Sequence, residues 1–481
     1  MKKYICIHGH FYQPPRENAW TGEIDAQHSA HPYKNWNERI SAECYTPMSV
    51  AKILDEHGAV KKIINNYAHI SFNFGATLLS WMEKNDAYAY HKIIEADKLS
   101  CTFNNNHGNA IAQVYNHVIM PLANYHDKET QIIWGIEDFI YRFKRKPEGM
   151  WLAETAVNTE TLELLVNHNI KFTILSPRQA KAFKLVEGST WKEINDKNKL
   201  DTTQQYLCKL PSGKSIVLFF YDGALASDVA FNGALHNGKI FSEKIKNSFH
   251  TQTNKPQLIH VATDGESYGH HHRFGEMALA SCINNFEHDA EIKITNYANY
   301  ISLFEPFSEI QIRENSSWSC VHGVERWRSN CGCSDGANAN YHQQWRAPLR
   351  NALNWLRDEA AIIFENEICK YYPDAWEVRN KYIHVMLQRN LIEEFLQTYF
   401  SGATQEKEKI IALFEMQKFS LLMFTSCAWF FDDVSRIETK QVLQYAERTI
   451  EYAESIAGKS FREKFLELLT LTPSNVSTYG N

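Results

Sequence analysis

The sequence predicts an α/β fold that is followed by an all-helical domain. Over roughly the first 300 residues, short apolar runs alternate with amphipathic segments, as expected of parallel strands covered by helices on both faces. The pattern of apolar and polar residues changes after Glu305, and from Gln344 onward the apolar residues recur at helical spacing. Because 481 residues exceed what one simple core usually organises, we expect one large domain plus a second.

The first domain should contain a series of buried parallel strands. Apolar runs of strand length lie at residues 4–8, 69–74, 99–103, 150–154, 171–176, 216–222 and 258–264. Helix-like stretches lie between them, such as 159–168 with Asn158 or Thr159 as a suitable N-cap. The polar stretch 184–214 holds Pro211-Ser212-Gly213 between apolar runs, which predicts a hairpin. Such a row of βα units predicts a barrel or a doubly wound sheet.

The second half of the chain is organised differently. The expected boundaries are a first domain at 1–305, an irregular connector rich in Cys and Trp at 306–345, and a helical domain at 346–481. The helices of the last domain are expected at 347–366, 376–399, 405–424 and 439–456.

Composition and charge exclude several classes of partner. A formal net charge of −6 without a concentrated basic block argues against nucleic acid or anionic lipid as the main partner. No run approaches the ~18 uninterrupted apolar residues of a membrane span. Met1-Lys2-Lys3 leads directly into a predicted strand and not into a secretory signal. We therefore expect a cytoplasmic protein with reduced cysteines and no cofactor, while the sequence predicts no oligomeric state.

Two carboxylates stand where catalytic side chains gather in parallel βα folds, at the carboxyl ends of strands. Glu154 follows the apolar run 150–153, and Asp264 ends the run 258–264, with Glu266 close behind. A carboxylate pair at separate strand ends can flank one glycosidic bond, as glycoside hydrolysis requires. Taken alone, Glu154 is equally well explained by a helix start, and the Asp264-Gly265 dipeptide by a turn.

Histidines at the same strand ends allow a rival chemistry. His8, His10, Asp264 and either His270 or His272 could bind a divalent metal that activates water, as in a metal-dependent hydrolase or deacetylase. A glycan-binding protein without catalysis is a further alternative. Neutral imidazoles also hydrogen-bond sugar hydroxyls, so the histidines by themselves do not choose among these classes.

The connector carries a second cluster, made of Cys320, His322, Cys331 and Cys333. Three cysteines and a histidine can bind zinc tetrahedrally. Their C-x-H…C-x-C spacing differs from the usual patterns built on C-x-x-C, so we expect no metal here and interpret the thiols as small side chains that pack the connector. Trp318 lies in the same segment and is a candidate for lining a cleft.

Four motifs carry a resemblance to a known family. They are His10-Phe11-Tyr12-Gln13-Pro14, Gln113-Val114-Tyr115-Asn116-His117 followed by Met120-Pro121, Trp151-Leu152-Ala153-Glu154, and Asp264-Gly265-Glu266-Ser267-Tyr268-Gly269-His270. In this order they resemble the conserved regions of glycoside hydrolase family 57, whose members act on α-glucans. The residues after 318 resemble an uncharacterised extension in one branch of that family, the domain of unknown function 3536.

The resemblance implies a fold and roles for individual residues. It implies an incomplete (β/α)7 barrel at 1–305 before the helical domain. The chain is expected to be a shortened form or part of a longer protein, with its helical domain truncated. Glu154 would be the nucleophile and Asp264 the general acid/base. The expected substrate-binding residues are His10, Gln13, His117, Trp151, Glu266, His270, Trp318 and Trp429. His271 and His272 replace the aromatic residues that usually follow the histidine of the fourth motif.

The implied function is that of a retaining glycoside hydrolase with a carbohydrate substrate of α-glucan type. The same residues would serve a transglycosylase, such as a 4-α-glucanotransferase or a branching enzyme, if a sugar hydroxyl replaced water as the acceptor. The metal-dependent hydrolase remains the second alternative.

Overall fold

The computed structural model describes residues 2–251, 253–336 and 338–479. The chain divides into two compact units. The first unit comprises Met1–Gln13, Ala26–Gln113 and Arg142–Glu314, and the second comprises Pro14–Asp25, Val114–Tyr141 and Asn315–Asn481. Two stretches that the sequence placed in the first domain, 14–25 and 114–141, therefore belong to the second unit.

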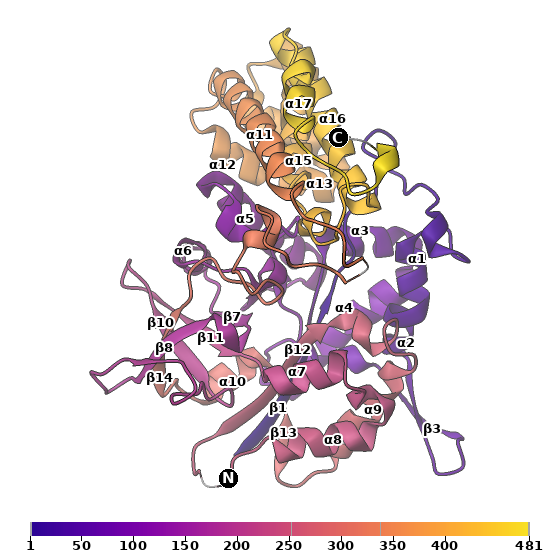
Figure 1. The fold of residues 1–481 in the computed structure, drawn as a ribbon, viewed down its shortest axis with the longest axis vertical. Coiled ribbons are helices and arrows are strands. Elements are labelled where there is room, and N and C mark those ends of the chain that lie inside the picture. Colours follow the sequence, from indigo (N-terminus) through magenta and orange to yellow (C-terminus); the bar gives the residue numbers. More distant parts are fainter. Residues whose placement is uncertain (1, 252, 337, 480–481) are drawn as a thin grey trace. The chain divides into compact units, whose positions relative to one another are not determined.

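A parallel sheet forms the centre of the first unit (Figure 1). Its central strand β1 (Lys3–Phe11) pairs in parallel with β12 (Gln257–Asp264), β13 (Ile292–Ile294) and β4 (Ser71–Phe74). The last seven residues of β1 are all buried, which is the pattern of a strand covered on both faces.

The parallel series continues through short strands. β5 (Ala112–Gln113) pairs with β6 (Met150–Trp151), and β7 (Phe172–Leu175) pairs with β11 (Ser215–Phe220). Isolated parallel bridges join Phe72 to Ala110 and Gly149 to Phe172. The order of neighbours is thus β12, β1, β4, β5, β6, β7 and β11, although the described residues form no single closed sheet. The predicted α/β class is confirmed.

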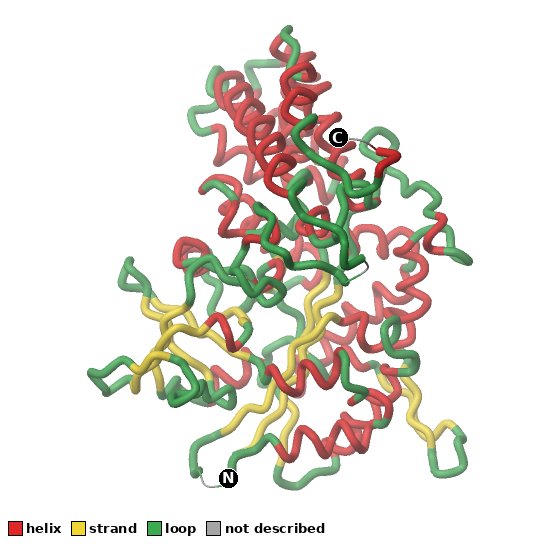
Figure 2. The backbone as a smooth tube through the Cα atoms, in the orientation of Figure 1, coloured by secondary structure: helices red, strands yellow, loops and turns green. Residues whose placement is uncertain are grey.

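An extension of mixed strand direction continues from β11. It contains β10 (Gln205–Lys209), β14 (Ser308–Ile312), β8 (Ala180–Leu185) and β9 (Lys192–Glu193), in the sheet order β7-β11-β10-β14-β8-β9. Figure 2 shows strands in yellow, and Figure 1 labels β7, β8, β10, β11 and β14. The hairpin predicted within 184–214 is confirmed, because β10 and β11 are antiparallel and Gly213 N donates to Leu210 O in the turn between them.

Helices flank these strands in the first unit. They are α1 (Trp36–Ile40), the π-helical turn η2 (Ser41–Tyr45), α2 (Thr46–Ser49), α3 (Ala76–Asn85), α4 (Ala87–Phe103), α6 (Thr159–Asn167), α7 (Gly223–Ala230), α8 (Gly238–Asn247), α9 (Gly275–Glu287) and α10 (Tyr297–Leu303). A hairpin of β2 (Ala51–Leu54) and β3 (Val60–Ile64) follows α2. The expected cap of α6 is present, since the Asn158 side chain accepts from Thr161 N.

One predicted strand is wrong. Residues 99–103 form the last turn and a half of α4, whose buried residues Ala89, Ile93, Ala96 and Ser100 recur at helical spacing. A short apolar run cannot by itself be assigned to a strand or a helix, and here it continues an amphipathic helix that Asp86 caps through Ala89 N. The strand next to β4 is instead β5, only two residues long.

The second unit is helical, as predicted. It contains α5 (Tyr125–Phe143) as far as Tyr141, then α11 (Arg346–Ile368), α12 (Ala375–Lys381), α13 (Ile383–Leu387), α14 (Ile392–Phe400), α15 (Lys407–Leu422), α16 (Ile437–Ala457) and α17 (Arg462–Leu469). Helix α11 packs against α15, α16 and α17. The single helix expected at 376–399 is divided into α12, α13 and α14, with extended backbone at Gln388. Among the described residues, no helix is both long and apolar enough to cross a bilayer.

Candidate active site

The two predicted carboxylates lie at the carboxyl ends of strands in the first unit. Glu154 stands in η5 (Ala153–Thr155), the turn that follows β6 after one residue. Asp264 is the last residue of β12 and lies opposite His10 in the register with β1. Residues 150–153 before Glu154 are fully buried, so the strand that leads to this carboxylate is anchored in the core.

The turn that presents Glu154 has an unusual backbone. Glu154 has φ of 56° and Thr155 has φ of 52°, both in the left-handed region that residues with a Cβ rarely adopt. Such a conformation costs on the order of 1–3 kcal/mol per residue and persists only where the surroundings enforce it. Backbone strain of this kind is concentrated at functional sites, and here it falls on the predicted nucleophile.

Gln179 enforces this turn. Its side chain is fully buried in η6 (Pro177–Gln179), directly after β7. Gln179 Nε2 donates to Thr155 O at 2.8 Å, and Gln179 Oε1 accepts from Thr155 Oγ1 at 2.7 Å. The same Oε1 accepts from Ser176 N at 2.8 Å. One amide therefore satisfies the Thr155 hydroxyl and carbonyl groups of the strained turn and fixes both to the adjoining strand.

The environment of Asp264 favours its protonated form. Burial, then the charge of Glu266, then the charge of Glu154 raise the pKa of Asp264 to about 8. The side chain nevertheless remains accessible to solvent, as a group that must meet a ligand should be. The next residue must be glycine, because a Cβ at Gly265 would lie 2.2 Å from the ring of Phe11.

Glu266 lies next to Asp264 but is itself buried. Its Oε1 accepts from the Tyr45 hydroxyl at 2.5 Å and from Tyr12 N at 3.2 Å. Burial raises the pKa of Glu266 to about 7, while hydrogen bonds from Tyr45, Tyr12 and Gln13 oppose the rise. Glu266 therefore acts on the charge state of Asp264, in addition to the substrate contact that the sequence predicts for it.

A chain of neutral hydrogen bonds joins the ends of β1, β4 and β5. The Asn73 amide donates to His10 Nδ1 at 2.9 Å and to Gln113 Oε1 at 2.7 Å. His8 Nε2 lies 3.0 Å from Asn73 Oδ1, and His8 Nδ1 lies 3.0 Å from Ser71 Oγ. Because an amide nitrogen can only donate, His10 Nδ1 accepts, which places the imidazole proton on Nε2. Burial lowers the pKa of His8 to about 3, so that ring is neutral.

Trp151 supports both imidazoles. Its indole stacks on His8 at 5.0 Å and on His10 at 4.9 Å between ring centroids, with interplanar angles of 18° and 20°. Trp151 is fully buried. A direct contact with a sugar would require this ring to become exposed, whereas its stacking already orients His10.

His270 is held by an acidic partner. Its Nδ1 lies 2.5 Å from Glu43 Oε2, and Arg39 Nε donates to the other Glu43 oxygen at 3.1 Å. Burial alone would raise the pKa of Glu43, but the hydrogen bonds from His270 and Arg39 lower it. Glu43 and Tyr45 both come from the π-helical turn η2, a type of turn that is often found at functional sites.

The other predicted residues belong to the second unit. His117 is buried with φ of 55°, and its Nδ1 lies 2.7 Å from Ser426 Oγ. Burial lowers the pKa of His117 to about 3. Trp429 is fully buried and stacks on the guanidinium of Arg350, which lies 4.1 Å from the ring centroid. Trp318 is half-buried.

The histidines do not assemble as the metal alternative requires. Both ring nitrogens of His8 already have hydrogen-bond partners, and His270 Nδ1 is engaged by Glu43. Within the part of the chain that the structure describes, the only group of at least three potential metal ligands that come together is Cys320, His322, Cys331 and Cys333. These contacts leave neither ring nitrogen of His8 available to a metal ion.

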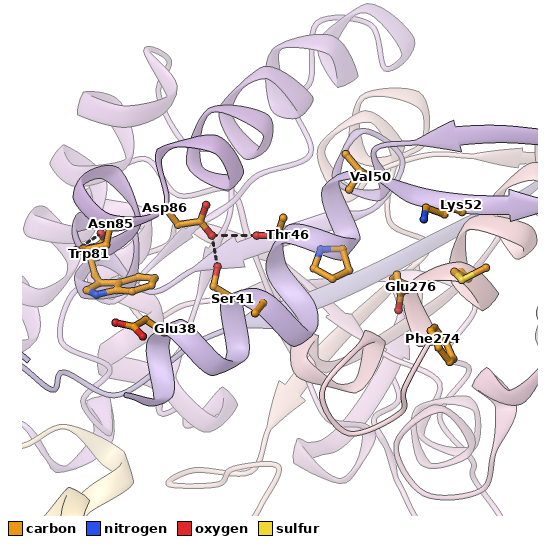
Figure 3. A pocket seen from close by; sticks show the side chains of 13 residues that line it. Glu38, Ser41, Thr46, Val50, Lys52, Trp81, Asn85, Asp86, Phe274 and Glu276 are labelled. Carbon is orange, nitrogen blue, oxygen red and sulfur yellow. Dashed lines mark hydrogen bonds between the residues drawn. The ribbon is translucent and has the colours of Figure 1, made fainter. Parts of the chain in front are cut away.

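A pocket of about 630 Å³ adjoins the same π-helical turn (Figure 3). Ser41 and Thr46 on its wall both donate hydrogen bonds to Asp86. None of the predicted site residues lines it. Ser41 and Ala42 of this turn thus line the pocket, while Glu43 and Tyr45 of the same turn contact site residues.

Sequence reasoning missed the residues that position the site. Gln179, Tyr45 and Glu43 touch predicted site residues from elsewhere in the chain, and Tyr45 lies 221 positions from Glu266. No local motif marks them. The only available signal was Ser176 followed three residues later by Gln179, a capping-box pattern that reads as a local turn.

Comparisons with known proteins match both parts of the chain to family profiles. The profile of glycosyl hydrolase family 57 matches residues 7–313, and that of a domain of unknown function, DUF3536, matches residues 341–481. No curated protein gives a significant match. Among solved structures, an exo-type maltose-forming amylase from Pyrococcus sp. ST04 aligns with a TM-score of 0.75 at 16% identity, over 98% of this chain and 83% of that chain.

Two further solved structures have the same fold. A branching enzyme from Pyrococcus horikoshii aligns with a TM-score of 0.57 at 15% identity, over 98% of this chain and 94% of that chain. A 4-α-glucanotransferase from Thermococcus litoralis aligns with a TM-score of 0.55 at 13% identity, over 94% of this chain and 60% of that chain. At such identities the likeness establishes the fold and leaves the reaction open.

Proposed function

Because this chain belongs to glycosyl hydrolase family 57, an enzyme family acting on glucans, we propose that it cleaves α-glucan-like oligo- or polysaccharides with retention of anomeric configuration. In this proposal Glu154 is the nucleophile and Asp264 is the general acid/base. The observation that carries it is the carboxylate pair after β6 and β12, in which burial, then the charge of Glu266, then that of Glu154 raise the pKa of Asp264 to about 8. An acid with that pKa is protonated at neutral pH and can donate to a leaving group.

The reaction would proceed in two steps. The Glu154 carboxylate attacks the anomeric carbon, while Asp264 transfers its proton to the glycosidic oxygen that leaves. Asp264 then takes a proton from an incoming water molecule, whose oxygen displaces Glu154. Loss of the Glu154 charge in the intermediate lowers the pKa of Asp264, which is the change that the second step needs. Retention requires the two carboxyl groups to be ~5–5.5 Å apart in the substrate complex.

Neutral and paired polar groups around the carboxylates would bind the sugar. His10 is fixed by Asn73 and Trp151, and its proton on Nε2 suits a hydroxyl acceptor. Gln13 and His270 are the further candidates of the first unit. His117, Trp318 and Trp429 remain proposals for substrate binding by the second unit.

We also infer that the strand series β1, β4, β5, β6, β7, β11 and β12 is the incomplete (β/α)7 barrel expected of the family. Asp222 N, which follows β11, donates to His260 O in β12 at 2.9 Å, so backbone contact continues at the end of the series. This arrangement would bring Glu154 and Asp264 to one rim.

The decisive experiment separates the two carboxylates by chemical rescue. Glu154→Ala and Asp264→Ala should each lose on the order of 10³-fold in kcat on an aryl maltooligosaccharide whose leaving group departs without protonation, and azide should restore turnover in both. A nucleophile variant should then yield the glycosyl azide with inverted configuration, and an acid/base variant the azide with retained configuration. Rescue products of the opposite configurations, or full activity in either variant, would refute the assignment.

Product analysis distinguishes hydrolysis from transfer. With wild-type protein and a single maltooligosaccharide, hydrolysis gives only shorter products, whereas transfer to a sugar hydroxyl also gives longer ones. Both outcomes use Glu154 and Asp264, so the rescue experiment and this one answer separate questions.

A further inference from the structure

The cluster in the connector has the dimensions of a metal site. The four potential ligand atoms of Cys320, His322, Cys331 and Cys333 all lie within 4.8 Å of one another. Cys320 Sγ is 3.7 Å from Cys333 Sγ and 4.0 Å from Cys331 Sγ, and Cys333 Sγ is 3.6 Å from His322 Nδ1. A tetrahedral zinc ion with Zn–S of about 2.3 Å and Zn–N of about 2.05 Å has S–S edges of about 3.8 Å and S–N edges of about 3.5 Å. These three individual separations therefore match edges of that tetrahedron.

Two simpler explanations of the cluster fit less well. A disulfide needs two sulfur atoms about 2.05 Å apart. It would join only two of the three thiols and would not explain the imidazole beside them. Thiols that only fill a core should be buried, yet Cys331 and Cys333 are half-buried, His322 is exposed, and only Cys320 is buried. The spacing along the chain favoured packed thiols, whereas the arrangement in space favours a ligand set.

The backbone is shaped to bring the ligands together. Gly332, between Cys331 and Cys333, has φ of 80°, a conformation that allows both thiols to turn to the same side. Gly323, directly after His322, has φ of 89°, and a Cβ there would lie 2.4 Å from Asn315 O. Gly323 N also donates to Cys320 O at 3.1 Å, which closes a turn around the first two ligands.

A buried positive charge, that of Arg346, lies next to the cluster. Arg346 is fully buried, its Nη1 lies 3.8 Å from Cys331 Sγ, and it donates to Cys333 O at 2.9 Å. Its Nε has no hydrogen-bond partner, and among the described residues Asp432, whose negative charge acts on this guanidinium, forms no ion pair with it. Three thiolates and one neutral imidazole around Zn²⁺ carry a net charge of about −1, which would neutralise this buried guanidinium.

We propose that Cys320, His322, Cys331 and Cys333 bind one structural zinc ion. Four protein ligands leave no open coordination position, so the ion would not activate water. It would instead fix the segment 320–333 within the second unit. Trp327 Nε1 in this segment donates to Ser426 O at 3.1 Å, and Arg326 Nη1 donates to Phe430 O at 2.9 Å. Zinc would thereby hold in place η12 (Ser426–Trp429), whose first residue contacts His117.

Metal analysis of the full-length protein tests the proposal. Wild type purified without chelator should contain about one zinc per chain, and Cys333→Ser and Cys320→Ser should retain less than about a tenth of that. Cys369→Ser is the matched control, because its thiol lies outside the cluster and is exposed, and it should keep the full amount. Glu154→Gln should also keep it, which makes the result independent of the proposed catalysis.

A second measurement does not depend on whether the variants fold. Wild type stripped of metal and titrated with Co²⁺ should show tetrahedral ligand-field bands in the visible and a thiolate-to-cobalt charge-transfer band, saturating at one equivalent. Chelation should lower Tm, and added zinc should restore it. Wild type that takes up neither zinc nor cobalt, a cobalt spectrum without thiolate bands, or equal zinc loss in Cys369→Ser would overturn the proposal.

Discussion

Replacing Gln179 by leucine should lower the reactivity of Glu154, the proposed nucleophile, although Glu154 itself is unchanged. The substitution removes the acceptor of Thr155 Oγ1 and Ser176 N and the donor to Thr155 O, all in a fully buried site. The Thr155 hydroxyl still has Glu154 O as an acceptor, so two groups, Ser176 N and Thr155 O, lose their partner. Each buried group left without a partner costs about 1–3 kcal/mol, so the free energy of unfolding should fall by about 2–6 kcal/mol. With the clamp gone, Glu154 and Thr155 can leave their left-handed conformations, and a displacement of about 1 Å costs on the order of 10²-fold in rate.

The assay must separate positioning from folding. The rate at which a mechanism-based inactivator labels Glu154 should fall about 10²-fold in Gln179→Leu at a temperature where circular dichroism shows folded protein, with kcat reduced more than KM rises. Thr155→Val, which removes only the hydroxyl donor, should have a smaller effect. Gln205→Leu is the control, because Gln205 is a buried glutamine in β10 that donates to Phe304 O. Gln179→Leu with wild-type labelling, or equal kcat losses in the Gln205 control, would refute the reasoning.

Three further predictions concern charge and orientation. In a plot of kcat/KM against pH, the value should fall near pH 8, where Asp264 loses its proton. Glu266→Gln removes a like charge beside Asp264, so it should move this fall to lower pH by on the order of one unit. An unchanged profile in Glu266→Gln would contradict the prediction. The raised pKa also means that the folded state binds the Asp264 proton more tightly than the unfolded chain, so this contribution to stability is complete below about pH 3.8 and is lost as pH rises to about 8. Asp264→Asn should therefore have a higher Tm than wild type at pH 9 and an equal one at pH 3.5, as differential scanning calorimetry can measure. Asn73→Leu should lower kcat/KM about tenfold, through a higher KM and a lower kcat, because His10 loses the amide that fixes its tautomer. Asn85→Leu, at the exposed end of α3, should change neither KM nor kcat.

The class of fold and the candidate carboxylates could be predicted from the sequence because their signals are local. An apolar run that ends in a polar residue describes a buried strand and its carboxyl end within a few positions, as at Met150–Trp151 before Glu154 and along β12 before Asp264. The same locality explains the error at 99–103, where five apolar and polar residues fit a strand as well as the last turns of α4. β5 was missed because two residues are too few to show any period.

The sequence by itself determined the class of fold and the helical second half, and it singled out Glu154 and Asp264 as candidates, since these inferences depend on hydrophobic periodicity and on side chains next to it. Only the tertiary structure decided how those carboxylates are held. Gln179 clamps a left-handed turn, and Tyr45 reaches Glu266 across 221 positions of chain. It likewise decided that four residues with an unfamiliar spacing surround one point, because ligand geometry depends on where the chain folds and not on how many residues separate the ligands.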